Sequence, residues 1–249
     1  MELELVLLAA IVALANTVEA VTGFGASIVA LTLGALLRPV PELIPILIPL
    51  NLGLSAAIVL RGRRVIDRPL LLRTIVPHAG LGLVAGFALF VGVGDEPALV
   101  LAYGGFVVVL AVSRLWALLR EGEGAAATSS TRSPLWLVAG GVMQGLFTAG
   151  GPLVILYTSA ALPDKTAFRA TMSGLWLILN LALVVGFTIH GDLDAATLRE
   201  TATMVPSLLV GLVLGEWLHH RVSPRGFRGL VFGLLLIAGG ILVGRGLLA

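Results

Sequence analysis

The 249-residue sequence contains no cysteine, which excludes a disulfide framework, thiol catalysis and a thiolate metal site. Charged residues are also scarce. They make up 12% of the chain, about half of the ~25% that a soluble domain carries. With 58% hydrophobic residues and a mean hydropathy of +1.05, the chain has too few polar side chains to cover a water-soluble fold of this size. We therefore expect an all-α, polytopic protein of the cell inner membrane.

Motifs of the main competing classes are absent as well. The sequence has no HExxH or GxSxG pattern and its four histidines are scattered, so neither a metal centre nor a nucleophile–base pair is predicted. The lack of a P-loop excludes self-contained ATP-driven pumping. The net charge of +2 comes from arginines grouped between apolar runs, which indicates membrane orientation rather than a nucleic-acid surface. We expect no enzyme activity, cofactor, metal or nucleic-acid partner.

Apolar runs dominate the sequence, and several approach or exceed the ~18 residues typical of a membrane span. A polar stretch rich in Gly, Ser and Thr, "EGEGAAATSSTRS" (121–133), leaves five of these runs on each side. The runs fall at 3–21, 24–37, 43–60, 70–92, 97–119, 134–148, 152–162, 170–189, 201–218 and 227–247. We predict a first transmembrane repeat at 1–120, a cytoplasmic linker at 121–133 and a second transmembrane repeat at 134–249.

Two sequence offsets relate the halves. An offset of 125 residues aligns "EAVTGFGASIVAL" (19–31) with "QGLFTAGGPLVIL" (144–156), and an offset of 129 aligns "LNLGL" (50–54) with "LNLAL" (179–183). The second offset also pairs Pro77 with Pro206, Gly82 with Gly211 and Gly86 with Gly215. Because Asn and Pro coincide at one offset, these pairings indicate an internal repeat rather than a chance match between abundant glycines.

Loop charge predicts how each repeat enters the membrane. The loop at 61–73 carries five arginines against one aspartate, and the loop at 219–228 carries three arginines and two histidines without an acid. Both are expected in the cytoplasm, whereas the acidic loops around Asp95 and Asp192 are expected outside. The halves then enter from opposite sides, which predicts inverted-topology repeats with both termini extracytoplasmic, an architecture of many secondary transporters.

Each repeat contains a glycine-rich break between apolar segments, "TGFGAS" (22–27) in the first and "TAGGP" (148–152) in the second. Non-helical backbone at membrane depth is tolerated only where protein or a water-filled cavity satisfies it. A helix that begins there points unpaired N–H groups and the positive end of its dipole into the membrane. Two broken helices near the midplane therefore predict a small-anion site made largely of backbone. The alternative is that these glycines only allow close helix packing.

Candidate binding residues come from these breaks and from one asparagine in the third segment of each repeat. An intramembrane Asn is costly unless hydrogen-bonded, and its amide can donate to an anion or join two helices. The predicted substrate-binding residues are Thr22, Gly23, Phe24, Gly25, Ala26, Ser27, Asn51, Thr148, Ala149, Gly150, Gly151 and Asn180.

Two titratable residues are candidates for coupling transport to an ion gradient. Glu19 lies just before the first break, where Gln144 lies before the second. It is predicted either to carry a proton or to fix the break as a hydrogen-bond partner. His78 is the second candidate, and its alternative is a packed histidine whose hydrogen bonds are satisfied within the protein.

Three stretches resemble the TauE/SafE family, also called the 4-toluene sulfonate uptake permease family: "GFGASIVALTL" (23–33), "PLNLGLSAAIVLRGRR" (49–64) and "GLFTAGGPLVILYTSA" (145–160). The resemblance implies export or uptake of small sulfur-containing anions such as sulfite or sulfonates, linked to an ion gradient, and of the two directions we expect export. We expect a secondary transporter that works by alternating access. An anion channel and a carboxylate transporter of the same fold are the alternatives. The coupling ion, proton or sodium, and a homodimer stay open.

Overall fold

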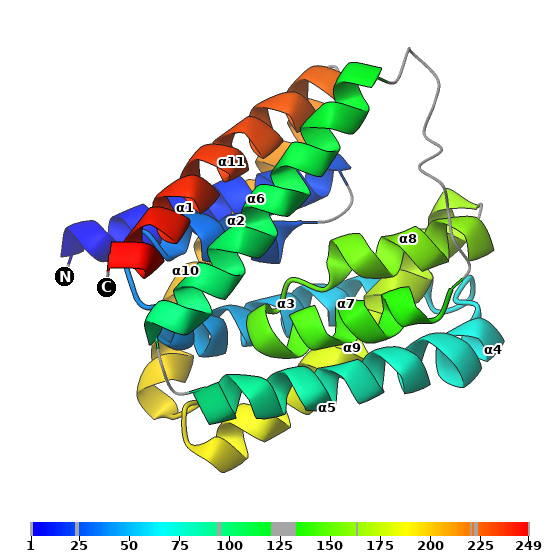
Figure 1. The fold of residues 1–249 in the computed structure, drawn as a ribbon. Coiled ribbons are helices and arrows are strands. Elements are labelled where there is room, and N and C mark those ends of the chain that lie inside the picture. The colour runs from blue at the N-terminus through cyan, green and yellow to red at the C-terminus, as the bar shows by residue number, and fades with distance from the viewer. Residues whose placement is uncertain are drawn as a thin grey trace. The chain divides into compact units, whose positions relative to one another are not determined.

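The computed structural model describes residues 2–22, 25–93, 96–120, 133–162, 164–219, 221 and 224–248. Every regular element in these ranges is a helix (Figure 1). Within the described residues, seven helices are long and apolar enough to cross a membrane, and α7 (Leu135–Phe147) is a shorter apolar helix. The prediction of an all-α, polytopic membrane protein is confirmed. Most of the predicted linker, residues 121–132, lies outside the described residues.

The first half of the chain forms α1 (Glu2–Thr22), α2 (Ala26–Gly34), α3 (Val40–Gly62), α4 (Arg68–Leu70), the π-helical turn η1 (Leu71–Ile75), α5 (Val76–Val93) and α6 (Glu96–Arg120). The second half forms α7, α8 (Gly151–Ala161), α9 (Lys165–His190), α10 (Ala195–His219) and α11 (Pro224–Leu248). α4, η1 and α5 follow one another without interruption. The wide π turn ends two residues before Pro77, whose ring removes a helical hydrogen bond and crowds the preceding turn.

The helices group into two compact units that cut across the two halves. Unit 1 comprises residues 1–44, 93–128 and 202–249, and unit 2 comprises residues 45–92 and 129–201. Each unit therefore combines helices from both halves of the sequence. The division into repeats at 1–120 and 134–249 concerns the sequence and stays a prediction.

In unit 1, α11 lies antiparallel to α6 (Figure 1). A Cβ atom at Gly104 would lie 3.0 Å from Val243 N, and one at Gly246 would lie 2.9 Å from Leu101 Cβ. Glycine at these positions lets the two helix backbones approach closely, which is how membrane helices gain packing contacts without a hydrophobic driving force.

The same kind of glycine contact joins α10 to α1 in unit 1 and α5 to α7 in unit 2. A Cβ at Gly211 would lie 2.3 Å from Ala13 O, and a Cβ at Gly82 would lie 2.1 Å from Val138 O. The 129-residue offset relates the two glycines, and the 125-residue offset relates Ala13 to Val138. Gly215 and Gly86 repeat the pattern one turn later, against Thr17 O and Val142 O respectively. The repeat that sequence comparison indicates is thus matched by equivalent contacts.

Candidate functional site

The first break turns the chain back on itself within unit 1. α1 ends at Thr22 and α2 begins at Ala26. Gly25, which precedes α2, has φ 102° and ψ 2°, a left-handed conformation that glycine adopts without steric cost. Arg38, just beyond α2, forms an ion pair with Glu4 in the first turn of α1. Because the far end of α2 meets the start of α1, the two helices form an antiparallel hairpin, and α2 returns toward the side from which α1 enters.

The second break forms the same kind of hairpin within unit 2. Thr148 has φ 53° and is the one non-glycine residue with positive φ in the described part of the chain. A Cβ at Gly140 in α7 would lie 2.5 Å from Val154 Cγ2 and 3.1 Å from Gly150 O. The middle of α7 therefore faces the first turn of α8, and α8 runs back along α7.

A side-chain acceptor bridges each break. The Glu19 carboxylate accepts a hydrogen bond from Ala26 N–H at 3.1 Å, and Gln144 Oε1 accepts one from Gly150 N–H at 3.1 Å. The 125-residue offset relates Glu19 to Gln144. Both side chains thus satisfy a backbone donor at the start of the returning helix. The carboxylate in one break corresponds to a neutral amide in the other.

The hydrogen bonds from Ala26 N–H to Glu19 and from Gly150 N–H to Gln144 leave fewer free backbone N–H groups at the breaks than the sequence predicts. At α8, Leu153 N–H and Val154 N–H both donate to Gly150 O, and Pro152 has no N–H. Gly150 N–H is taken by Gln144. Within the described residues, Gly151 N–H is the remaining donor of the first turn.

Asn180 connects the second break to α9. It is 2% exposed, and Gln144 Nε2 donates to its Oδ1 at 3.0 Å. Because Gln144 Oε1 is held by the Gly150 N–H, the Gln144 amide has one orientation, and that orientation makes Asn180 Oδ1 the acceptor. The Asn180 Nδ2 group donates to no acceptor among the described residues.

Thr148 supplies a second unused polar group. Its side chain is 3% exposed, and its Oγ1 has no hydrogen-bond partner in the described structure. Buried hydroxyl groups are normally hydrogen-bonded, since leaving one unpaired costs about 1–3 kcal/mol. Together with Gly151 N–H and Asn180 Nδ2, this hydroxyl gives the second break three groups able to donate hydrogen bonds.

The other predicted residues lie around the two breaks or outside the described chain. Ala26 and Ala149 are buried, and Ser27 and Asn51 are half-buried. Thr22 is the last residue of α1, and Gly23 and Phe24 lie outside the described residues. His78 lies in α5, where its Nδ1 donates to Thr74 O at 2.7 Å.

Asn16 is a buried polar residue that sequence reasoning missed. It is 5% exposed, its Nδ2 donates to Val12 O at 2.8 Å, and its Oδ1 has no partner in the described structure. An asparagine one turn before Glu19 within an apolar run was a signal that could have identified it. Asn16 has no counterpart in the second repeat, where the 125-residue offset places Gly141.

Comparison with known proteins gives one family match. The model of the family described as "Sulfite exporter TauE/SafE" matches residues 8–242. The chain is similar to the "Probable inner membrane transporter protein TsaS" of Comamonas testosteroni, with 31% identity over 133 residues, which are 51% of this chain and 53% of the relative. It is also similar to the "Probable sulfite/organosulfonate exporter TauE" of Cupriavidus necator, with 26% identity over 144 residues, which are 58% of this chain and 53% of the relative. Each match thus spans about half the length of the relative. No solved structure matches.

Proposed function

The chain belongs to the sulfite exporter TauE/SafE family, and we propose that it is a secondary transporter that exports small sulfur-containing anions across the inner membrane by alternating access. The printed names of the two relatives, an inner membrane transporter and a sulfite/organosulfonate exporter, support this substrate class and location. The seven apolar helices of spanning length among the described residues support a multi-pass carrier.

The observation that carries the proposal is the donor set at the second break. Gln144 fixes both Gly150 and the acceptor atom of Asn180, so the groups left over are Asn180 Nδ2, Gly151 N–H and the Thr148 hydroxyl. Two of these three groups can only donate, and the hydroxyl can rotate to donate. Hydrogen-bond donors next to a helix N-terminus suit an oxyanion such as sulfite or a sulfonate, whose oxygens accept hydrogen bonds.

The repeat extends this assignment to the first break. Gly25, Ala26 and Ser27 occupy the positions that Gly150, Gly151 and Pro152 occupy in the second break, and Asn51 corresponds to Asn180. We assign these residues, together with Thr22, Gly23, Phe24 and Ala149, to the substrate site or its immediate surroundings.

We assign the coupling of transport to an ion gradient to Glu19, because it bridges the first break as Gln144 bridges the second and differs from Gln144 in being ionisable. Glu19 is ionisable and Gln144 is not, so a proton bound or released at Glu19 would change the first break alone. His78 is the second candidate, and its Nδ1 donates a hydrogen bond to Thr74 O. Sodium in place of a proton is the alternative coupling ion.

Counterflow in liposomes tests the proposal. Purified protein is reconstituted, and uptake of labelled sulfite is measured with and without unlabelled sulfite, taurine, sulfate or acetate inside. A carrier of sulfur anions should show saturable uptake that internal sulfite accelerates. Uptake that grows linearly with concentration and ignores internal sulfite would indicate a channel. Acceleration by acetate alone would indicate a carboxylate carrier.

Asn180→Leu tests the site in the same assay. Hydrogen bonds to charged groups contribute about 1.5–3 kcal/mol, so sulfite affinity should fall roughly ten-fold or more. Thr188→Val is the matched control, because it also removes a polar group from α9, and the Thr188 hydroxyl only donates to Val184 O of its own helix. Equal sulfite affinity in both variants would remove Asn180 from the site.

A further inference from the structure

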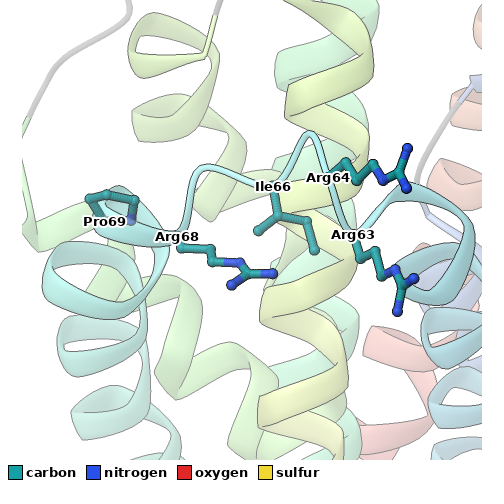
Figure 2. Close-up of a pocket in the computed structure, with 5 residues that line it drawn as sticks. All are labelled: Arg63, Arg64, Ile66, Arg68 and Pro69. Carbon is teal, nitrogen blue, oxygen red and sulfur yellow. The ribbon is translucent and has the colours of Figure 1, made fainter.

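The segment that joins α3 to α4 contains a pocket that the transport site does not use. It has a volume of about 460 Å³ and is lined by Arg63, Arg64, Ile66, Arg68 and Pro69. Figure 2 shows Ile66 between Arg68 on one side and Arg63 and Arg64 on the other. All three arginines are exposed. Three arginines thus line a pocket whose other lining residues, Ile66 and Pro69, are apolar.

No acidic side chain in the described part of the chain neutralises the positive charge of this pocket. Asp67 is the one acidic residue between 61 and 73, and its carboxylate accepts a hydrogen bond from Leu70 N–H at 3.0 Å, which caps α4. The part of the chain that the structure describes offers no carboxylate within ion-pair distance of Arg63, Arg64 or Arg68. A set of arginines that no acid pairs with can hold an anion through several charge-assisted hydrogen bonds.

Exposed apolar side chains flank the arginines on both sides along the chain. Leu60, at the end of α3, is 73% exposed, and Leu72, in η1, is 56% exposed. Val65, within the loop, is 43% exposed. α3 and the continuous helix Arg68–Val93 are both candidate membrane spans, so this segment connects two spans at the membrane surface. Cationic and apolar groups side by side at that depth match a lipid, which has a charged headgroup next to acyl chains.

We propose that Arg63, Arg64 and Arg68 bind the phosphate of an anionic phospholipid, with the acyl chains lying along the apolar side chains beside the pocket. A free phosphate or the transported anion would share the same oxyanion chemistry. The phospholipid is favoured because Ile66 and Pro69 line the pocket itself and because a free anion would have no use for the exposed leucines. This assignment does not depend on what the protein transports.

Titration of the detergent-solubilised protein with short-chain phosphatidylglycerol tests the site, with short-chain phosphatidylcholine as the neutral lipid. Each arginine near a headgroup contributes about 1 kcal/mol, so R63Q/R64Q should raise the apparent Kd for phosphatidylglycerol about 30-fold. The matched control is R61Q/R73Q, which removes the same charge from exposed positions of the same segment outside the pocket. It should raise the Kd less than about three-fold.

Three results would overturn the proposal. Equal loss of affinity in the two double variants would show a general electrostatic effect instead of a site. Equal binding of phosphatidylglycerol and phosphatidylcholine would show that the phosphate charge is not recognised. Pocket-dependent binding of inorganic phosphate or sulfite as tight as that of phosphatidylglycerol would assign the arginines to a soluble anion. Ligand binding is followed in each case by thermal melting of the full chain, so a variant that does not fold is identified by its lack of a transition.

If R63Q/R64Q does not fold, R68Q alone replaces it, and R68Q should raise the Kd for phosphatidylglycerol about five-fold.

Discussion

Thr148, in the second break, has an unfavourable backbone conformation and a hydroxyl group that is unpaired within the described residues. Positive φ is unfavourable for a β-branched side chain, and residues held in such regions cost about 1–3 kcal/mol. Its buried hydroxyl is unpaired within the described structure as well. In the first break the left-handed residue is Gly25, which has no side chain; the 125-residue offset relates Gly25 to Gly150 rather than to Thr148. Glycine at this position would have neither the steric cost of positive φ nor an unpaired hydroxyl. The presence of threonine is explained if its hydroxyl contacts the substrate.

Thr148→Gly should therefore separate stability from binding. Removing the strained side chain and its unpaired hydroxyl should leave the melting temperature of the substrate-free protein unchanged or higher. The loss of a donor to an anion should weaken sulfite binding by roughly ten-fold. Both quantities can be measured by thermal shift with and without sulfite. A stable variant with unchanged sulfite affinity would exclude Thr148 from the site.

Glu19→Gln tests coupling because glutamine is the residue that performs the same bridging role in the other break. The amide oxygen can still accept from Ala26 N–H, so we expect the variant to fold and to exchange sulfite in counterflow. If Glu19 carries the coupling proton, net uptake should no longer respond to an imposed pH gradient. A pH response equal to that of the unaltered protein would shift the assignment to His78, for which His78→Gln is the next variant.

The paired hairpins show where sequence reasoning succeeds and where it stops. The breaks at 22–27 and 148–152 were predictable because glycine clusters within apolar runs are unusual. The hydrogen bond between Gln144 and Asn180 was not, since residues 36 positions apart meet only through the packing of α9. The glycines of α5 and α10 were predictable as repeat markers, but their partners lie in the other half of the chain. Helix pairing depends on side-chain fit that a single sequence does not display.

Gly86→Ala tests the close approach of α5 to α7. The new Cβ would lie 2.1 Å from Val142 O, a backbone atom that cannot move without shifting α7. Overpacking of this kind typically costs about 1–3 kcal/mol, so the melting temperature should fall. Gly80→Ala in the same helix is the control, because its Cβ would have no atom within 4 Å and alanine favours a helix. A melting temperature that falls equally in both variants would contradict the close packing of these two helices.

Because the chain contains no cysteine, labelling of single introduced cysteines can determine its orientation in the membrane. We expect the arginine-rich loop in the cytoplasm and the acidic α9–α10 loop outside. Because α2 returns along α1, the end of α2 should lie on the same side as the α9–α10 loop. In intact cells, L37C and A196C should react with a membrane-impermeant maleimide, and V65C should react only after permeabilisation.

Two patterns would contradict this topology. If V65C alone reacted in intact cells, the orientation would be reversed. If L37C behaved as V65C does, α2 would continue across the membrane and the first break would not form a hairpin. The unaltered protein, treated with the same maleimide, gives the background labelling, since its sequence contains no cysteine.

The mixing of helices from both halves in each compact unit has a consequence for biosynthesis. During translation, α1 enters the membrane long before the ribosome has made α10. Until then the Thr17 hydroxyl donates to Ala13 O of its own helix, and its second acceptor, Gly211 O, follows 194 positions later in the chain. α6 likewise precedes α11, and α5 precedes α7. The nascent first half therefore carries glycine faces that only lipid or the insertion machinery can cover. A ribosome that stalled in the linker would release a product with neither unit complete, and membrane proteases should degrade it.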